Sequence, residues 1–266
     1  MKLKQLVVAV SLSLGLAACG GGGGSSSSSS SPSYDFKVTA VDGYLKNAVV
    51  TATCDGKTFV GTTNENGVAE LNTNSTNCSV VITAKADGST IDMDTGETYA
   101  AGSLYLVSPA GQNKTSLIAS PFTTMVALLM ESSGGSVDLD AAIAQIADGF
   151  GIDASLVTGD FIAAGDDEVA LKASALLSSA VLPKTAEEFN AQVANESTTQ
   201  AVITKLLKIN TAVEAQIEEL KNNGEDLSTV IITVTVAADG SVTTEVEDKP
   251  LATGATDSAV GGGTGN

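Results

Sequence analysis

Residues 120–129, with the sequence SPFTTMVALL, mark the point where this chain changes from strand-like to helix-like periodicity. A serine followed by proline is typical of a helix N-cap with proline in the first helical position. Phe122, Met125 and Val126 then recur at a spacing of one to three residues and share one helical face with Leu129. Apolar residues alternate with polar ones before this stretch and follow the helical period after it. We therefore predict an α+β fold.

The region 34–110 has the composition of short β-strands. Apolar and β-branched residues alternate with polar ones in four segments, at 36–41, 48–53, 57–62 and 79–84. Turn signals of the Asp-Gly and Asn-Gly type separate the segments. Short strands spaced in this way indicate a small N-terminal β-sandwich over residues 34–110.

The region 111–227 carries apolar residues at helical spacing. Repeats follow the first stripe at residues 139–150, 169–180 and 202–220. The last stripe contains Val202, Leu206, Ile209, Val213, Ile217 and Leu220. Each stripe is narrow and backed by polar residues, so we predict helices that pack together as an α-helical bundle. The alternative interpretation is that one of these faces binds a partner.

The C-terminal part returns to strand-like alternation. Residues 228–247 contain two alternating segments around an Asp-Gly turn at 239–240, which predicts a β-hairpin. A hairpin alone is only marginally stable in water, so we expect it to add to the first sheet or to lie on the bundle. Residues 248–266 are small, polar and rich in glycine, and we predict a disordered tail.

The N-terminus has the features of a lipoprotein signal. A basic start and an apolar segment lead to the sequence LAAC at residues 16–19, which predicts a signal peptide over residues 1–18 and lipidation of Cys19. An ordinary signal peptide with an incidental cysteine is the alternative. Residues 20–33 are almost entirely Gly and Ser and predict a flexible tether. Because Gly20 rather than an aspartate follows the cysteine, we expect localisation at the outer membrane, with the protein exposed at the cell surface.

Charge and composition exclude several classes of function. Removal of Lys2 and Lys4 with the signal leaves 11 lysines against 31 acidic residues, a net charge of −20. So acidic a chain repels nucleic acid. The chain contains no His, no Trp and no Arg, which excludes a Ser-His-Asp triad and an imidazole zinc site. Ser-Lys hydrolases and carboxylate-pair glycosidases need no His, but we expect the protein not to be an enzyme.

Two cysteines remain beyond Cys19. In an oxidising compartment, Cys54 and Cys78 are expected to form a structural disulfide. Redox catalysis is the alternative, but it typically uses a Cys-x-x-Cys spacing that these residues lack.

An acidic segment around Gly96 suggests a cation site. Asp92, Asp94 and Glu97 could wrap a hard cation such as calcium, and we expect no other cofactor. The alternative is an acidic hairpin turn, because the fifth-position ligand and distal glutamate of an EF-hand loop are not clear. The acidic cluster at 166–168 is interpreted as the start of a helix.

Four segments resemble, in the same order, the N-terminal region of accessory colonization factor AcfD and its secreted mucin-degrading lipoprotein relatives. They are residues 41–50 (VDGYLKNAVV), 62–67 (TTNENG), 90–96 (TIDMDTG) and 120–126 (SPFTTMV). The resemblance covers residues 16–130, including the tether after the cysteine. It implies a membrane anchor and a surface-exposed accessory region. The opening β-region also resembles transthyretin-like or carboxypeptidase-regulatory modules, which implies a transthyretin-like or immunoglobulin-like β-sandwich. The protease activity of that family resides in a C-terminal zinc domain with a His-Glu-x-x-His motif, and a chain without histidine can inherit none of its catalytic or metal residues.

Together these features predict a non-catalytic lipoprotein anchored in the outer membrane, with an accessory role in colonisation, adhesion or envelope assembly. Its expected partners are the membrane, another envelope or surface protein, or a host glycan. One alternative is a surface protein that binds or cleaves glycans through carboxylates or calcium. Another is an anchored assembly factor that faces the periplasm.

Overall fold

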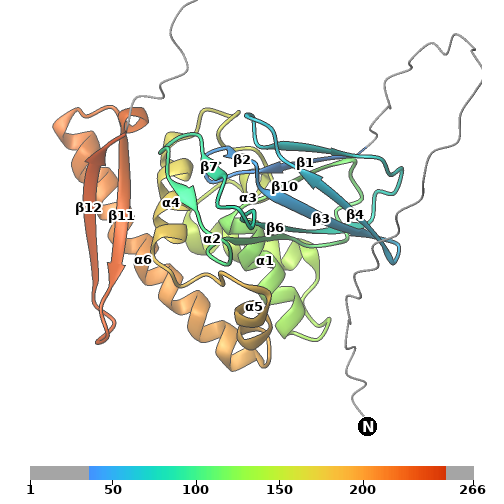
Figure 1. Cartoon of the computed structure of the whole chain (residues 1–266). Helices are drawn as coiled ribbons and strands as arrows, with labels where there is room; N and C mark the ends of the chain where they lie inside the picture. Colours follow the sequence, from blue (N-terminus) through green and yellow to red (C-terminus); the bar gives the residue numbers. More distant parts are fainter. Residues whose placement is uncertain (1–35, 250–266) are drawn as a thin grey trace, which may run out of the picture. The chain divides into compact units, whose positions relative to one another are not determined.

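The strands lie in the first half of the described chain, and the helices and a C-terminal hairpin lie in the second half (Figure 1). This computed structural model describes residues 36–249. The predicted signal peptide, Cys19, the tether and residues 250–266 of the predicted tail lie outside the described residues. The α+β class that the sequence predicts is confirmed.

The strands of the first half are short. They are β1 (Phe36–Ala40), β2 (Leu45–Lys46), β3 (Val49–Cys54), β4 (Lys57–Thr62), β5 (Val68–Leu71), β6 (Cys78–Thr83), β7 (Thr90–Asp92), β8 (Thr98–Tyr99), β9 (Tyr105–Ser108) and β10 (Ser116–Ala119). They form a four-stranded sheet in the order β4-β3-β6-β9, a three-stranded sheet in the order β10-β1-β5, and a small sheet in the order β2-β7-β8.

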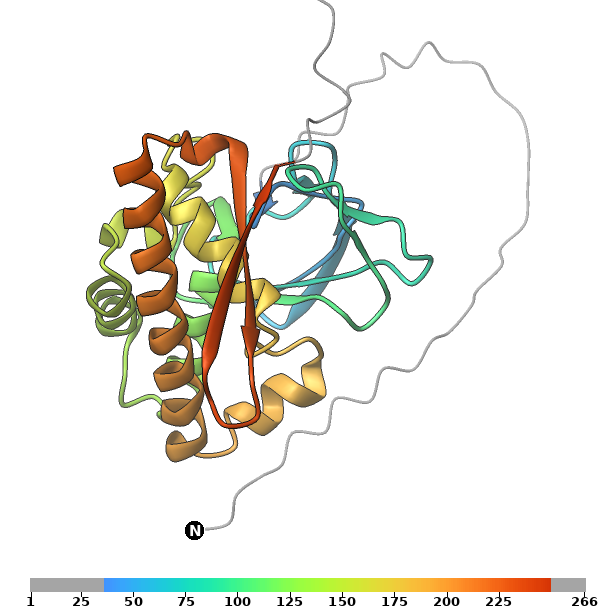
Figure 2. The ribbon, with the colours of Figure 1, turned by 90° about the vertical axis from the view of Figure 1, so that its left-hand side faces the viewer.

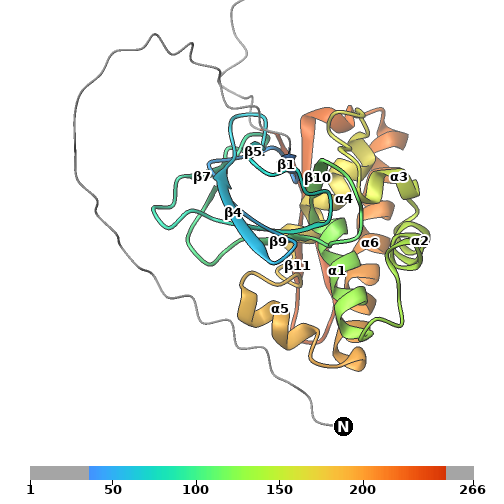
Figure 3. The ribbon, with the colours of Figure 1, turned by 90° about the vertical axis from the view of Figure 1, so that its right-hand side faces the viewer.

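The two larger sheets share one apolar core. Phe36 and Leu117 from one sheet and Val50, Ile82 and Leu106 from the other belong to the same buried cluster. Figure 3 shows the ribbons of β1 and β10 apart from those of β4 and β9, and buried residues of both sheets belong to this cluster. The alternating apolar residues of the sequence therefore face inward from both sheets, as period-two patterning requires.

The three-stranded sheet β10-β1-β5 contains one parallel pair of strands. The β1 strand pairs with β10, with Lys37 opposite Ser116 and Ala40 opposite Ala119. The expected boundary between β and helical regions at residues 110/111 is therefore too early, because it falls before β10. The sequence did not reveal this strand, because four residues directly before a helix cap carry too short a pattern.

The helices follow directly. They are α1 (Pro121–Ser132), α2 (Leu139–Phe150), α3 (Ala154–Val157), α4 (Asp167–Ser178), α5 (Ala186–Gln192) and α6 (Glu196–Asn223). The short helices α3 and α5 were not predicted. Asp166 caps α4 by accepting the backbone N–H of Val169 at 3.1 Å, which confirms the interpretation of the acidic cluster as a helix start.

The start of α1 is a capping box. Ser120 accepts the backbone N–H of Thr123 through its side chain, and Thr123 accepts the backbone N–H of Ser120 in return. The hydroxyl of Thr123 also donates to the carbonyl of Val107 in β9 at 2.7 Å. The polar residues of SPFTT thus join helix α1 to the sheet, and all of them are buried.

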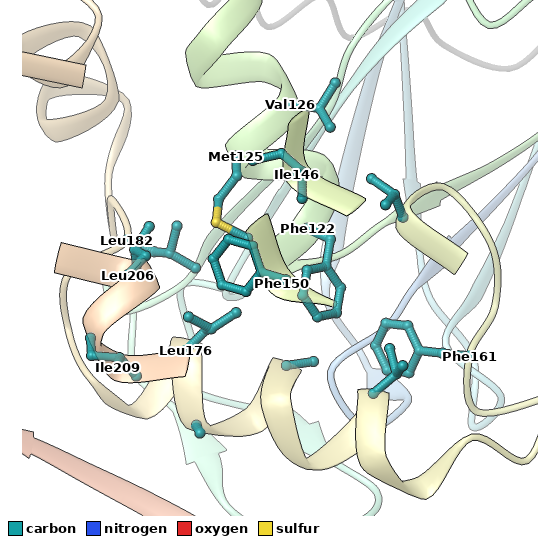
Figure 4. Packing of buried hydrophobic residues seen from close by; sticks show 14 of the residues in the cluster. Phe122, Met125, Val126, Ile146, Phe150, Phe161, Leu176, Leu182, Leu206 and Ile209 are labelled. Carbon is teal, nitrogen blue, oxygen red and sulfur yellow. The ribbon is translucent and has the colours of Figure 1, made fainter. Parts of the chain in front are cut away.

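The helices share a second apolar core. Figure 4 shows Phe122 of α1, Phe150 of α2 and Phe161 pointing toward one another, and the ring of Phe122 meets both others edge-on at 5.9 Å between centroids. The expectation of narrow stripes is wrong for α1, since its residues 121–129 are all buried. Strand β9 covers one side of α1 while α2, α4 and α6 cover others. In α6 the predicted stripe is wrong at one position, because Ile203 is buried while Val202 is only half-buried.

The C-terminal hairpin lies on the helices, one of the two placements that the sequence allowed. Strand β11 (Val230–Val236) pairs with β12 (Val242–Asp248) and packs on α4, while β12 packs on α6 (Figure 2). The strand extends to Asp248, so the start of the predicted disordered tail at residue 248 is wrong. Within residues 36–249, no helix is both long enough and apolar enough to cross a membrane.

Candidate functional site

Two adjoining hollows form a cleft between the β-region and the helical region. Their volumes are about 30 Å³ and about 440 Å³. The β1–β2 turn and the β7–β8 segment line one side, and α4 and β11 line the other. Five residues line both hollows: Asp42, Asp92, Thr95, Ser174 and Ile231. We call these two hollows the acidic cleft.

Asp42 and Asp92 are the two buried charged residues of the acidic cleft. Asp42 follows β1 in the turn to β2, and its side chain is 4% exposed. Its Oδ1 has no hydrogen-bond partner among the described residues. Burial raises the pKa of the Asp42 carboxyl well above its ordinary value of 3.8, and the negative charges of Asp92 and Asp94 raise it further. A buried carboxylate oxygen without a partner is costly, so this atom requires an explanation.

Asp92 ends strand β7 beside Asp42. Its Oδ1 accepts the backbone N–H of Asp94 at 2.7 Å and that of Thr95 at 3.4 Å, which shapes the β7–β8 turn. Burial raises the pKa of the Asp92 carboxyl, while those backbone N–H groups lower it. The residue is therefore both a turn-forming aspartate and a lining group of the cleft.

Gly43 allows the two turns to approach closely. A Cβ atom at this position would overlap Oδ1 of Asp92 and the Cβ of Asp94. Only a residue without a side chain fits between them. The Asp42-Gly43 pair, which the sequence indicates only as a turn, is therefore what brings the carboxyls of Asp42 and Asp92 to one cleft.

Two tyrosines lie at or near the same region. Tyr99 of β8 lines the larger hollow, and burial together with the charge of Asp42 raises the pKa of its hydroxyl far above the ordinary value. Tyr44 donates its hydroxyl to the carboxylate of Asp160 at 3.2 Å, linking the β1–β2 turn to the segment before α4. Burial and that carboxylate raise the pKa of Tyr44 to about 12. Both hydroxyls therefore stay protonated at neutral pH.

The three residues predicted to bind calcium do not form a ligand set. Asp92 accepts backbone N–H groups, Asp94 Oδ2 pairs with Lys249 Nζ at 2.9 Å, and Glu97 is exposed. Within residues 36–249, no group of three or more Cys, Asp or Glu side chains is placed to hold a metal ion. The calcium interpretation thus lacks the converging oxygens that a calcium ion requires.

The lining of the acidic cleft has an excess of negative charge. Five carboxylates line its two hollows, against the two lysines Lys184 and Lys249. Hydroxyl groups come from the opposite side, where Ser174 and Ser178 lie on α4 and Thr233 lies on β11. The arrangement can accept hydrogen bonds from a ligand with donor groups, and its field favours a positive charge.

The cysteines lie away from this cleft. Cys54 and Cys78 are directly opposite each other at the ends of β3 and β6, form a disulfide and are 1% exposed. Neither lines a hollow of the cleft. The predicted disulfide is thus present as a link within the four-stranded sheet. Cys19 lies outside the described residues.

Sequence reasoning missed Asp42, Tyr99, Ser174 and Lys249. Asp42 had one usable signal, since it stands between the apolar residues Val41 and Tyr44–Leu45 rather than in a polar loop. The others carry no local signal, because they come from separate parts of the chain. No protein-family model, no curated protein sequence and no solved structure matches this chain.

Proposed function

We propose that this protein is a non-catalytic lipoprotein, anchored in the outer membrane through Cys19 and exposed at the cell surface. Its role would be accessory: colonisation, adhesion or envelope assembly. The observation that carries this proposal is the complete lipoprotein signal, with LAAC at residues 16–19 directly before a Gly/Ser segment. The resemblance of residues 16–130 to accessory colonization factors points to the same class.

The absence of common catalytic residue types supports a binding or structural role. Histidine is the commonest general base, and arginine is the usual partner of phosphate and carboxylate groups. The whole sequence contains neither. A protein without them can still bind, and it can present a folded region away from a membrane on a flexible tether.

We further infer that the two larger sheets correspond to a transthyretin-like or immunoglobulin-like β-sandwich, followed by an α-helical bundle. The shared apolar core of the sheets supports the first part. The aromatic and aliphatic core of α1, α2, α4 and α6 supports the second.

Replacement of Cys19 tests the anchor. Cells that express the wild type or Cys19→Ala are fed a lipid analogue, and label and membrane fraction are compared. We expect the variant to lose the label and to leave the membrane fraction. The matched control, Cys54→Ala with Cys78→Ala, also replaces cysteines but should keep the label. Retention of Cys19→Ala in membranes at the wild-type level would refute the anchor. Protease accessibility on intact cells then separates a surface protein from a periplasm-facing assembly factor.

A second candidate function is glycan binding or cleavage through carboxylates. The specific observation in its favour is that Asp42, Asp92 and Tyr99 line one hollow of about 440 Å³. Carboxylates often accept hydrogen bonds from the hydroxyl groups of sugars. A pair of carboxyl groups can also act as acid and base in glycoside hydrolysis. If this is the function, Asp42→Asn and Asp92→Asn should each abolish binding or cleavage of a neutral oligosaccharide.

A further inference from the structure

We propose that the acidic cleft binds a small organic cation through its ammonium group, with the carboxyls of Asp42 and Asp92 as the principal acceptors. This inference does not depend on the membrane anchor proposed for Cys19. It concerns the described residues alone.

The first argument is the unpartnered oxygen of Asp42. This side chain is buried, lines both hollows, and has an Oδ1 without a hydrogen-bond donor among the described residues. Buried polar atoms in folded proteins nearly always have a partner. A ligand with N–H groups in the cleft would supply the missing donor.

The second argument is the charge of the lining. Five carboxylates against two lysines produce a negative field in a partly enclosed site. Low-dielectric walls concentrate such a field and raise the local concentration of cations. An anionic ligand would be repelled, so the charge selects a ligand with a positive group.

The third argument separates an ammonium group from a metal ion. A calcium ion needs six to eight oxygen ligands, and no cluster of three acidic side chains in residues 36–249 is arranged for one. An ammonium group needs only about three acceptors. Asp42, Asp92 and the hydroxyl oxygen of Ser174 line the same cleft and provide three.

The protein already contains one contact of this kind at the edge of the cleft. The ammonium group of Lys249 pairs with Asp94 at 2.9 Å, and both side chains are about one-third exposed or less. The β7–β8 turn therefore binds one ammonium group at the smaller hollow, which Asp94 and Lys249 both line. Asp42 and Asp92 line the hollows, and within residues 36–249 neither forms an ion pair with a lysine.

The volume indicates the size of the ligand. The larger hollow, at about 440 Å³, has room for an organic molecule rather than for an ion alone. Leu177 and Ile231 also line it and offer apolar surface beside the charges. A short aliphatic chain that ends in an ammonium group matches both features.

Direct binding measurements test the proposal. The full chain, purified in a non-ionic detergent, is titrated with cadaverine at constant ionic strength, by calorimetry and by thermal shift. The comparison ligands are 1-pentanol, calcium chloride and a neutral disaccharide. We expect cadaverine to bind and to raise the melting temperature, while the comparison ligands do not.

Variants link the binding to the cleft. Asp42→Asn should weaken cadaverine binding by about tenfold or more, because it removes a charged acceptor. Ser174→Leu, which fills the cleft from α4, should also weaken cadaverine binding. It is the second test variant if Asp42→Asn does not fold. Glu245→Gln, an exposed acidic position on β12, should leave binding unchanged.

Three results would overturn the proposal. They are no binding of cadaverine, binding that is equal in the wild type and in both cleft variants, and binding of calcium or of the neutral disaccharide in its place. None of these results bears on the lipid label of Cys19, so failure of this inference and failure of the anchor are distinguishable.

Discussion

Thr124, in the first turn of α1, accepts the backbone N–H of Val107 in β9 through its hydroxyl oxygen at 2.9 Å. The hydroxyl of the neighbouring Thr123 donates a hydrogen bond to the carbonyl of Val107. Both threonines are fully buried. The helix therefore satisfies the backbone of the outer strand of the four-stranded sheet, at the junction where strands give way to helices.

Thr124→Val should destabilise the protein without changing its shape. Valine matches threonine in volume but leaves the buried N–H of Val107 without an acceptor, which costs about 1–3 kcal/mol. In a chain of this size, 1 kcal/mol lowers Tm by about 2–4 °C. Thermal unfolding followed by circular dichroism measures the loss. Thr204→Val, at an exposed position of α6, is the control and should change Tm little. Equal Tm values for the two variants would contradict the role of Thr124.

Lys172→Met should weaken the contact between three helices. The ammonium group of Lys172, which is 6% exposed, donates to the carbonyl of Phe150 and to Glu214, each at 2.7 Å. Phe150 ends α2, where a cation satisfies a terminal carbonyl and interacts well with the helix dipole. We expect a loss of about 1–3 kcal/mol in denaturant unfolding.

A second lysine on the surface controls for charge. Lys221 pairs with Glu168 at 2.6 Å, but both side chains are about half exposed. Solvent screens such a pair, so Lys221→Met should have a much smaller effect than Lys172→Met. A larger loss in Lys221→Met would show that net charge, rather than the buried contact, determines the stability.

Asp42→Asn should stabilise the protein at neutral and alkaline pH. Because the pKa of Asp42 is raised in the folded state, the folded chain keeps a proton that the unfolded chain releases near its ordinary pKa of 3.8. The folded state is therefore favoured below that pH, and this stabilisation is lost as the pH rises toward the folded-state pKa. Asparagine has no charge to bury and avoids the loss.

The measurement is Tm as a function of pH from about 4 to 8. The difference between Asp42→Asn and the wild type should be smallest near pH 4 and should grow with pH. For comparison, the Tm of Glu245→Gln, a variant at an exposed position, should follow the same pH dependence as the Tm of the wild type. A pH-independent difference would show that Asp42 ionises normally in the folded chain.

Removal of the disulfide should destabilise the sheet. The bond joins residues 24 apart in the sequence, and closing a loop of this length stabilises the fold by about 3–3.5 kcal/mol in the chain-entropy model. Cys54→Ala with Cys78→Ala should lower the free energy of unfolding by a similar amount, measured in urea. The wild type under reducing conditions should match the double variant. If reduction leaves the unfolding midpoint unchanged, the disulfide does not contribute to stability.

The sequence predicted the local features of this fold well. Ser120 and Asp166 cap their helices, and Gly151 and Gly224 end theirs in the left-handed conformation, as their residue types indicate. A helix cap depends on contacts within about four residues, so its signal is contained in the local sequence. The same holds for the strands of the C-terminal hairpin, which an Asp-Gly turn connects.

The candidate site was only partly predictable, because its residues come from distant segments and no local signal shows that they meet. The sequence singled out Asp92, but it grouped this residue with the neighbouring Asp94 and Glu97. The structure places Asp92 with Asp42, which lies fifty residues earlier, and with Ser174 on α4. Asp42 lies in an Asp-Gly pair, whose ordinary interpretation is a turn, so its burial was not apparent.

What the sequence by itself determined is the order of the strand-rich and helix-rich regions, the caps of the longer helices, the disulfide pair, and the absence of histidine and arginine. Periodicity, capping and composition encode these directly. The tertiary structure alone decided the parallel pairing of β1 with β10, the burial of α1 on all sides, and the meeting of Asp42 with Asp92 and Ser174. These contacts join distant segments, and they arise from loop closure and packing, which no local pattern encodes.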